Sequence, residues 1–131
     1  MSTRPRVLLA EDHPGVIRAL QRVLSAQCDV VGLVDDGREV AGAAARLEPV
    51  VSVVDLHLPN VSGLEACRRI MRTNQRAKVI LITALIDDGV RTAALAAGAS
   101  GCFSKLMAGT ELIDAIGGAW LELSGRDESL R

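Results

Sequence analysis

Hydrophobic residues are concentrated in five short runs, which alternate with longer stretches of mixed apolar and polar residues. The runs are rich in β-branched and other aliphatic residues, as expected for parallel strands that helices cover on both faces. They lie at residues 7–10, 30–34, 50–55, 79–82 and 101–104. We predict a helix after each run, so that strand and helix alternate along the whole chain.

The predicted helices are bounded by residues that favour helix ends. Pro14 suits the first turn of a helix, Asp87 is a good capping residue, and Gly98 is expected to end its helix in the left-handed conformation. The helices are expected to begin at residue 14, to end at residue 47, and to span residues 64–71, 90–97 and 108–119. Short connections and right-handed crossovers then predict an α/β fold, a five-stranded parallel sheet with helices on both faces.

Length and composition describe one ordinary globular domain. The chain has 131 residues, of which 49% are hydrophobic and 24% are charged, and this is enough to bury a proper core. We assign residues 1–123 to the domain. We expect residues 124–131, which are polar, to be a disordered end or the start of a linker to a missing output domain.

The net charge and the cysteines indicate in which cellular compartment the protein is expected. A formal net charge of −1 gives no general attraction to nucleic acid or to anionic lipid. The sequence has no apolar run of the ~20 residues that a membrane span needs, and no signal-peptide core at its beginning. Its three cysteines form no Cys-x-x-Cys pair, as expected of free thiols in a reducing compartment. We therefore expect a cytoplasmic protein without membrane contact.

Polar residues stand directly after four of the five predicted strands. Ligand and reaction sites of open α/β sheets lie outside the carboxyl ends of the strands, so these side chains are expected to converge. They are Glu11 and Asp12, Asp55, Thr83, and Lys105.

This set of side chains suits phosphoryl transfer. Three clustered carboxylates would repel one another, and a divalent cation that prefers oxygen ligands, above all Mg²⁺, would relieve that repulsion. A carboxylate beside such a cation can act as a nucleophile and form an acyl phosphate. Lys105 offers a positive charge and Thr83 a hydroxyl donor for the phosphoryl oxygens.

Motifs around these residues resemble the receiver domain of bacterial two-component response regulators over residues 6–120. The matching segments are Leu-Ala-Glu-Asp-His-Pro at 9–14, Val-Asp-Leu-His-Leu-Pro at 54–59, Ser-Gly-Leu-Glu at 62–65, Ile-Thr-Ala at 82–84 and Ala-Gly-Ala-Ser-Gly at 97–101. The resemblance implies a flavodoxin-like three-layer fold with the strand order 2-1-3-4-5. It also implies that the chain is a signalling phosphoacceptor and not an enzyme, although it would promote its own phosphorylation and dephosphorylation.

The resemblance assigns a role to each acidic residue of the cluster. Asp55 would accept a phosphoryl group from a sensor histidine kinase. Asp12 and Asp55 would bind Mg²⁺, or Mn²⁺, directly, together with the backbone carbonyl of His57. Glu11 would act on the cation through water.

Thr83 and Lys105 would bind the phosphoryl oxygens and transmit the switch. The family often has an aromatic residue three positions before the lysine, where this chain has Cys102. The neighbouring Phe103 should point to the other side of the strand. Because Cys102 is too small to fill an aromatic pocket, we expect the space beneath the helix that begins near Asp88 to be packed by Leu85 or left partly open.

The motifs also resemble regulators of the NarL/FixJ type, whose output is a helix-turn-helix DNA-binding domain. Either the chain is the receiver half of such a regulator, which would contact DNA only through the absent output domain, or it is a stand-alone receiver. The helix at 90–97, the strand at 101–104 and the last helix could form a homodimer face.

Two other functions remain open at this stage. An aspartyl-phosphate phosphatase would usually place a second acid two residues after its nucleophile, where this chain has His57. A degenerate receiver that serves only as a protein-binding module would not need all five site residues.

Overall fold

A computed structural model describes residues 4–105 and 108–129 of the chain. Strands and helices alternate strictly through this part of the molecule. The elements are β1 (Arg6–Ala10), α1 (Pro14–Ser25), β2 (Asp29–Val34), α2 (Gly37–Leu47), β3 (Val51–Asp55), α3 (Gly63–Thr73), β4 (Val79–Thr83), α4 (Asp88–Ala96), β5 (Gly101–Ser104) and α5 (Ala108–Ser129).

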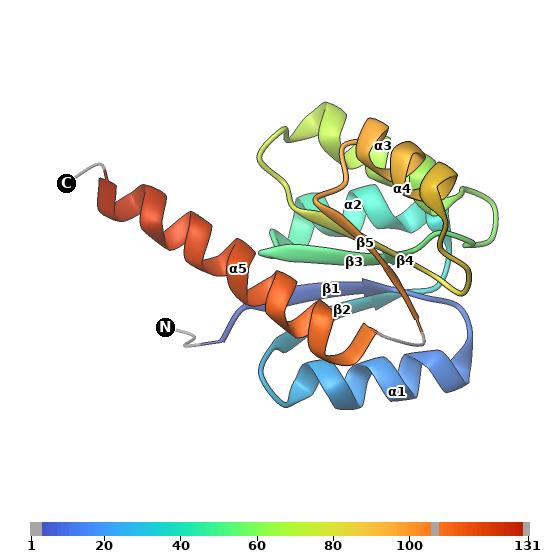
Figure 1. Cartoon of the computed structure of the whole chain (residues 1–131), viewed down its shortest axis with the longest axis horizontal. Coiled ribbons are helices and arrows are strands. Elements are labelled where there is room, and N and C mark those ends of the chain that lie inside the picture. Colours follow the sequence, from blue (N-terminus) through green and yellow to red (C-terminus); the bar gives the residue numbers. More distant parts are fainter. Residues whose placement is uncertain (1–3, 106–107, 130–131) are drawn as a thin grey trace.

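The strands form one parallel sheet of order β2-β1-β3-β4-β5, as the resemblance implied. Figure 1 shows α1 and α5 on one face of this sheet and α2, α3 and α4 on the other. Every residue of β3 and β4 is buried, because both strands lie inside the sheet and are covered on both faces.

The strand register brings the carboxyl ends of the inner strands together. Ala10 pairs with Val54, Asp55 with Ile82, and Thr83 with Ser104. Residues that follow these strands therefore meet along one edge of the sheet, where the sequence predicted a site.

Helix ends largely follow the predicted signals. The side chain of Asp87 accepts a hydrogen bond from Val90 N at 2.8 Å, which caps α4. Gly98 has φ of +97°, and Ala99 N donates to Ala94 O at 3.0 Å. This is a Schellman ending with glycine in the left-handed conformation, so the prediction for Gly98 is confirmed.

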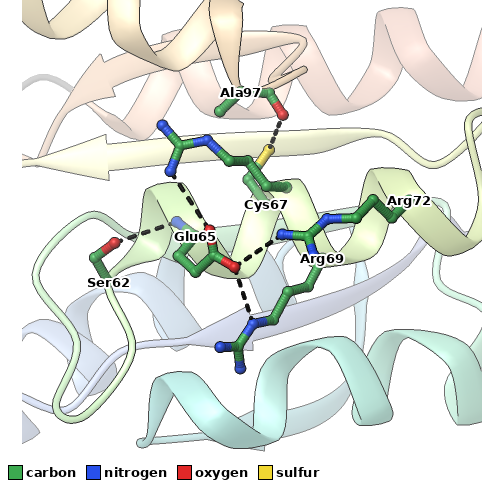
Figure 2. Close-up of polar contacts among 7 residues, drawn as sticks. Ser62, Glu65, Cys67, Arg69, Arg72 and Ala97 are labelled. Carbon is green, nitrogen blue, oxygen red and sulfur yellow. Dashed lines mark hydrogen bonds and ion pairs between the residues drawn. The ribbon is translucent and has the colours of Figure 1, made fainter.

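Helix α3 is stabilised by ion pairs on its exposed face and by a hydrogen bond on its buried face (Figure 2). Glu65 lies 3.1 Å from Arg69, 2.9 Å from Arg72 and 3.6 Å from Arg68, and the hydrogen bond from Arg69 lowers the pKa of the Glu65 carboxyl. On the buried side, Cys67 Sγ donates to Ala97 O at 3.4 Å, which joins α3 to the end of α4. Burial raises the pKa of the Cys67 thiol to about 11.

The last helix is longer than predicted. We expected it to end near residue 119 and expected a polar tail from residue 124, but α5 continues to Ser129. The ion pair between Lys78 Nζ and Glu122, at 3.1 Å, holds the extended part of the helix to the body of the domain. The leucines and charged residues of this segment are also compatible with a helix.

The structure also bears on the expectations about the cysteines and about membrane-spanning segments. Cys28, Cys67 and Cys102 are all free and buried. In the part of the chain that the structure describes, no helix combines the length and the apolar character needed to cross a membrane.

Candidate functional site

Three carboxylates meet at the carboxyl edge of the sheet. One oxygen from each of Glu11, Asp12 and Asp55 lies within 4.8 Å of the others. Glu11 and Asp55 are buried, whereas Asp12 is exposed. The structure thus brings together the three acidic residues that the sequence placed at the ends of two strands.

Lys105 reaches into the cluster from the end of β5. Its Nζ lies 3.0 Å from Glu11 Oε2 and 3.0 Å from Asp55 Oδ2. Lys105 N donates to Thr83 O at 2.8 Å, which anchors the backbone from which the side chain extends. Burial alone would lower the pKa of Lys105, but its hydrogen bonds to Glu11 and Asp55 outweigh that effect and raise the pKa.

Glu11 is the most deeply buried charge of the site, with an exposed fraction of 0%. Oε1 accepts hydrogen bonds from His13 N and Lys105 Nζ, both at 3.2 Å. Oε2 lies close to Lys105 Nζ but has no well-directed hydrogen bond among the described residues. Burial and the charge of Asp55 raise the pKa of the Glu11 carboxyl, because both disfavour its ionised form.

These donors fit a divalent cation. The set consists of carboxylate oxygens alone, the Oε2 atom is buried without a well-directed partner, and Asp12 opens the cluster to solvent. Such hard oxygen ligands suit Mg²⁺ or Mn²⁺. Asp55 Oδ1 accepts a hydrogen bond from His57 N at 3.2 Å. The backbone of His57 therefore lies beside the Asp55 carboxylate, where its carbonyl could also bind the cation.

Thr83 stands beside the cluster at the end of β4. It is only 1% exposed, and its hydroxyl donates to Leu85 O at 3.2 Å. The hydroxyl is therefore engaged with the loop that leads to α4. If the hydroxyl turned to a new acceptor, the loop before α4 would lose this contact.

Gly63 has a role in the site that sequence reasoning missed. A Cβ at this position would lie 2.3 Å from Asp55 O and 2.8 Å from Leu56 Cα. Only a glycine lets α3 begin directly against the end of β3. The signal was present in the Ser-Gly pair at the predicted loop, but the close approach depends on the tertiary packing.

The region around Cys102 corrects one expectation. Cys102 packs into the core beneath α2, α3 and α4, and Phe103 packs into the core on the other face, as predicted. Leu85, however, is 85% exposed and does not fill the space beneath α4. Ile86 and Val90 pack against that core instead. The hydrogen bond from Thr83 to the Leu85 carbonyl fixes the Leu85 backbone at the end of β4, and the Leu85 side chain points into solvent.

Comparison with known proteins agrees with this geometry. The model of the response regulator receiver domain family matches residues 7–117. The response regulator GacA of Pseudomonas viridiflava is 37% identical over 114 residues, which cover 85% of this chain and 53% of that protein. The transcriptional regulatory protein LiaR of Bacillus subtilis is 37% identical over 113 residues, 85% of this chain and 54% of LiaR. The chain therefore spans about half the length of the curated relatives that it matches.

Solved structures show the same fold. A two-component response regulator of the LuxR family from Aurantimonas sp. SI85-9A1 superposes with a TM-score of 0.83 and 30% identity, over 88% of this chain and 84% of that one. The signal receiver domain of the response regulator NarL from Mycobacterium tuberculosis superposes with a TM-score of 0.79 and 26% identity, over 89% and 99% of the two chains. These neighbours match the type of regulator that the sequence motifs resembled.

Proposed function

The chain belongs to the response regulator receiver domain family, and on that premise we propose that Asp55 accepts a phosphoryl group from the phosphohistidine of a sensor kinase. The observation that carries the proposal is the position of Lys105, whose ammonium lies 3.0 Å from Asp55 Oδ2 at the edge of the acidic cluster. The Lys105 ammonium thus places a positive charge beside the carboxylate oxygen of Asp55, the proposed nucleophile. Such a charge stabilises the phosphoryl oxygens as the group is transferred.

The reaction exchanges one bond to phosphorus for another. A carboxylate oxygen of Asp55 forms a bond to phosphorus, the bond between phosphorus and the imidazole nitrogen breaks, and the leaving imidazole takes up a proton. The backbone N–H of His57 already donates to Asp55 Oδ1, which orients the carboxylate. Glu11, Asp12 and Asp55 would hold Mg²⁺, or Mn²⁺, with the His57 carbonyl, and the cation would neutralise charge on the transferred group.

Lys105 and Thr83 would bind the phosphoryl group of phosphorylated Asp55 and so sense that it is present. The phosphoryl group brings new anionic oxygens to the site, and Lys105 would pair with them. Thr83 would donate to the same group only after its hydroxyl leaves the Leu85 carbonyl. That exchange would free the loop before α4 and so carry the signal away from Asp55.

The surface of α4, β5 and α5 is our candidate for the face that reads the signal. Ala94 is the one buried residue of α4, and Leu95 is 65% exposed. A helix held by so little buried surface can shift at small cost. We propose that phosphorylation favours a homodimer through this face.

The relatives are about twice as long as the aligned part of this chain, and LiaR is a transcriptional regulator by name. We propose that residues 1–123 are the receiver unit and that residues 124–131 begin a linker toward a DNA-binding output domain. We place the reaction in the cytoplasm, which suits free thiols, and propose that the chain acts as a phosphoacceptor and not as an enzyme on a separate substrate.

A phosphorylation assay tests this function. The chain is incubated with acetyl phosphate and Mg²⁺, and the acyl phosphate is detected by intact mass. Asp55→Asn should abolish the product, because the amide is no nucleophile and a weaker metal ligand. Asp114→Asn, which changes an exposed carboxylate on α5, should leave it intact. An aspartyl phosphate on Asp55→Asn in comparable yield would refute the assignment.

A further inference from the structure

A second cavity lies at the end of the sheet opposite to Asp55. It has a volume of about 490 Å³ and is lined by the second half of α2, the end of α3, the start of β3, the loop that leads into β4, and α5. Its apolar lining comes from all of these sides and includes Ala41, Ala44, Ile70, Ala77 and Leu123. The cavity shares no residue with the acidic cluster.

The polar lining of this cavity is suited to an anion. Arg76 and Lys78 line it against one carboxylate, that of Glu48. Ser52 also lines it, and the alternation of side chains along β3 directs Ser52 to the same face as Val54, toward α2 and α3. Ser52 is only 3% exposed, and its backbone N–H donates to Lys78 O at 3.0 Å, which places it beside Lys78.

One wall of the cavity is a weakly held part of α5. Leu112 and Ile116 are the fully buried residues of this helix in its described part, and the pair Gly117–Gly118 follows them. Each glycine costs a helix about 1 kcal/mol relative to alanine. Figure 1 shows α5 continuing past the amino ends of the strands, where Lys78 Nζ pairs with Glu122 at 3.1 Å.

We propose that this cavity binds a small carboxylate with an apolar tail. The tail lies on the alanines and Ile70, and the carboxylate binds Lys78 and Arg76 within reach of the Ser52 hydroxyl. Because Glu122 already pairs with Lys78, the ligand competes with Glu122 for the same ammonium. Binding therefore releases the part of α5 beyond Gly117–Gly118.

Octanoate is a suitable probe, and octan-1-ol is its uncharged counterpart. Binding is followed by isothermal titration and by the fluorescence of Trp120, the single tryptophan of the chain, which lies on α5 two residues before Glu122. We expect one saturable octanoate site with NMR shifts at Ala44, Ala77 and Leu123. Lys78→Met should weaken octanoate binding about tenfold, as expected for one lost charge-assisted contact, and should change octan-1-ol binding little.

Glu122→Gln provides the sharper test, because it removes the competitor and keeps the cavity intact. It should strengthen octanoate binding several-fold. Arg46→Met, an exposed change on α2 outside the cavity, should have no effect. Asp55→Asn should bind octanoate normally, so that failure of the phosphoacceptor assignment and failure of this site remain distinguishable.

Filling the cavity gives an independent outcome. Ala44→Phe should block octanoate, whereas Ala96→Phe, at an exposed position of α4, should not. If Ala44→Phe does not fold, the two charge variants decide alone. Octanoate affinity that is unchanged in both Lys78→Met and Glu122→Gln, or NMR shifts scattered away from the cavity, would overturn the proposal.

Discussion

The ammonium of Lys105 lies 3.0 Å from Asp55 Oδ2, although β4 separates the strands that precede these two residues. The same ammonium lies 3.0 Å from Glu11 Oε2. One cation thus compensates two buried carboxylates, which would otherwise repel each other. If Asp55 accepts a phosphoryl group as we propose, Lys105 would exchange this contact for one with the phosphoryl oxygens.

Metal affinity should distinguish the two acids that follow β1. Asp12→Ala should weaken Mg²⁺ binding by a factor of roughly ten or more, as the loss of a coordinating group does, and Glu11→Ala should weaken it less. Asp12 is exposed to solvent, whereas Glu11 already binds Lys105. Isothermal titration with Mg²⁺, or the EPR signal of Mn²⁺, measures both variants. Equal losses would contradict the assignment of Asp12 as the direct ligand.

Gly63→Ala should disturb the backbone of Asp55, the proposed phosphoacceptor. The new Cβ would lie 2.3 Å from Asp55 O, so α3 or the end of β3 must move. We expect a loss of about 1–3 kcal/mol in the free energy of unfolding, as for other overpacked sites, together with slower phosphorylation. Urea unfolding and the acetyl phosphate assay measure the two effects.

A glycine of α2 supplies the control for this change. A Cβ at Gly42 would meet no atom within 4 Å, so Gly42→Ala should stabilise the helix by about 0.5–1 kcal/mol. It should leave phosphorylation unchanged. If Gly63→Ala were as harmless as Gly42→Ala, the close packing of α3 on β3 would not matter to the site.

The stability that the domain loses as the pH falls should depend in part on Asp36. Hydrogen bonds from Arg38 lower the pKa of this carboxyl to about 2, and Asn60 in the loop after β3 also donates to it, at 2.7 Å. A lowered pKa stabilises the folded state above the ordinary pKa of an aspartate, and this contribution is lost as the pH falls toward 2.

Asp36→Asn should therefore be less stable than the wild type at pH 7, and the difference should shrink as the pH falls from about 5 to 3. Asparagine keeps the helix-capping oxygen, so the change isolates the charge. Asp35→Asn, at the exposed neighbouring position, serves as the control. Urea unfolding across this pH range gives the answer, and a difference independent of pH would exclude the ionic explanation.

Signal transmission should depend on Thr83 more than on Cys102. Thr83→Ala removes the hydroxyl that bonds the Leu85 carbonyl, so it should keep phosphorylation at Asp55 but reduce any phosphorylation-dependent dimerisation. Cys102→Ala should change that response little, because the thiol is a small packed group. Sedimentation of the phosphorylated variants compares them.

The opposite ranking, with Cys102→Ala losing the response and Thr83→Ala retaining it, would reverse this account. Cys102→Tyr is a useful third variant. It places a ring among Ala94, Ala97 and Ala99, which share its core. It should strengthen the response if the pocket can open beneath α4.

The sequence alone determined the order of the elements and which polar residues converge at the edge of the sheet. Dense apolar runs can be buried only inside a sheet covered on both faces, and Asp55 and Thr83 end such runs. Parallel strands put their carboxyl ends on one edge, so the convergence of Glu11, Asp55 and Lys105 followed from chain order. Local signals also located the helix ends at Asp87 and Gly98.

Only the tertiary structure decided which neighbours share a contact. It packed Ile86 and not Leu85 against the core, because two adjacent loop residues compete for one space and the sequence does not rank them. It also set Gly63 against Asp55 and tied α5 to Lys78 through Glu122. These contacts join residues far apart in the chain, and their distances depend on how the layers pack, which no local pattern of hydrophobic and polar residues contains.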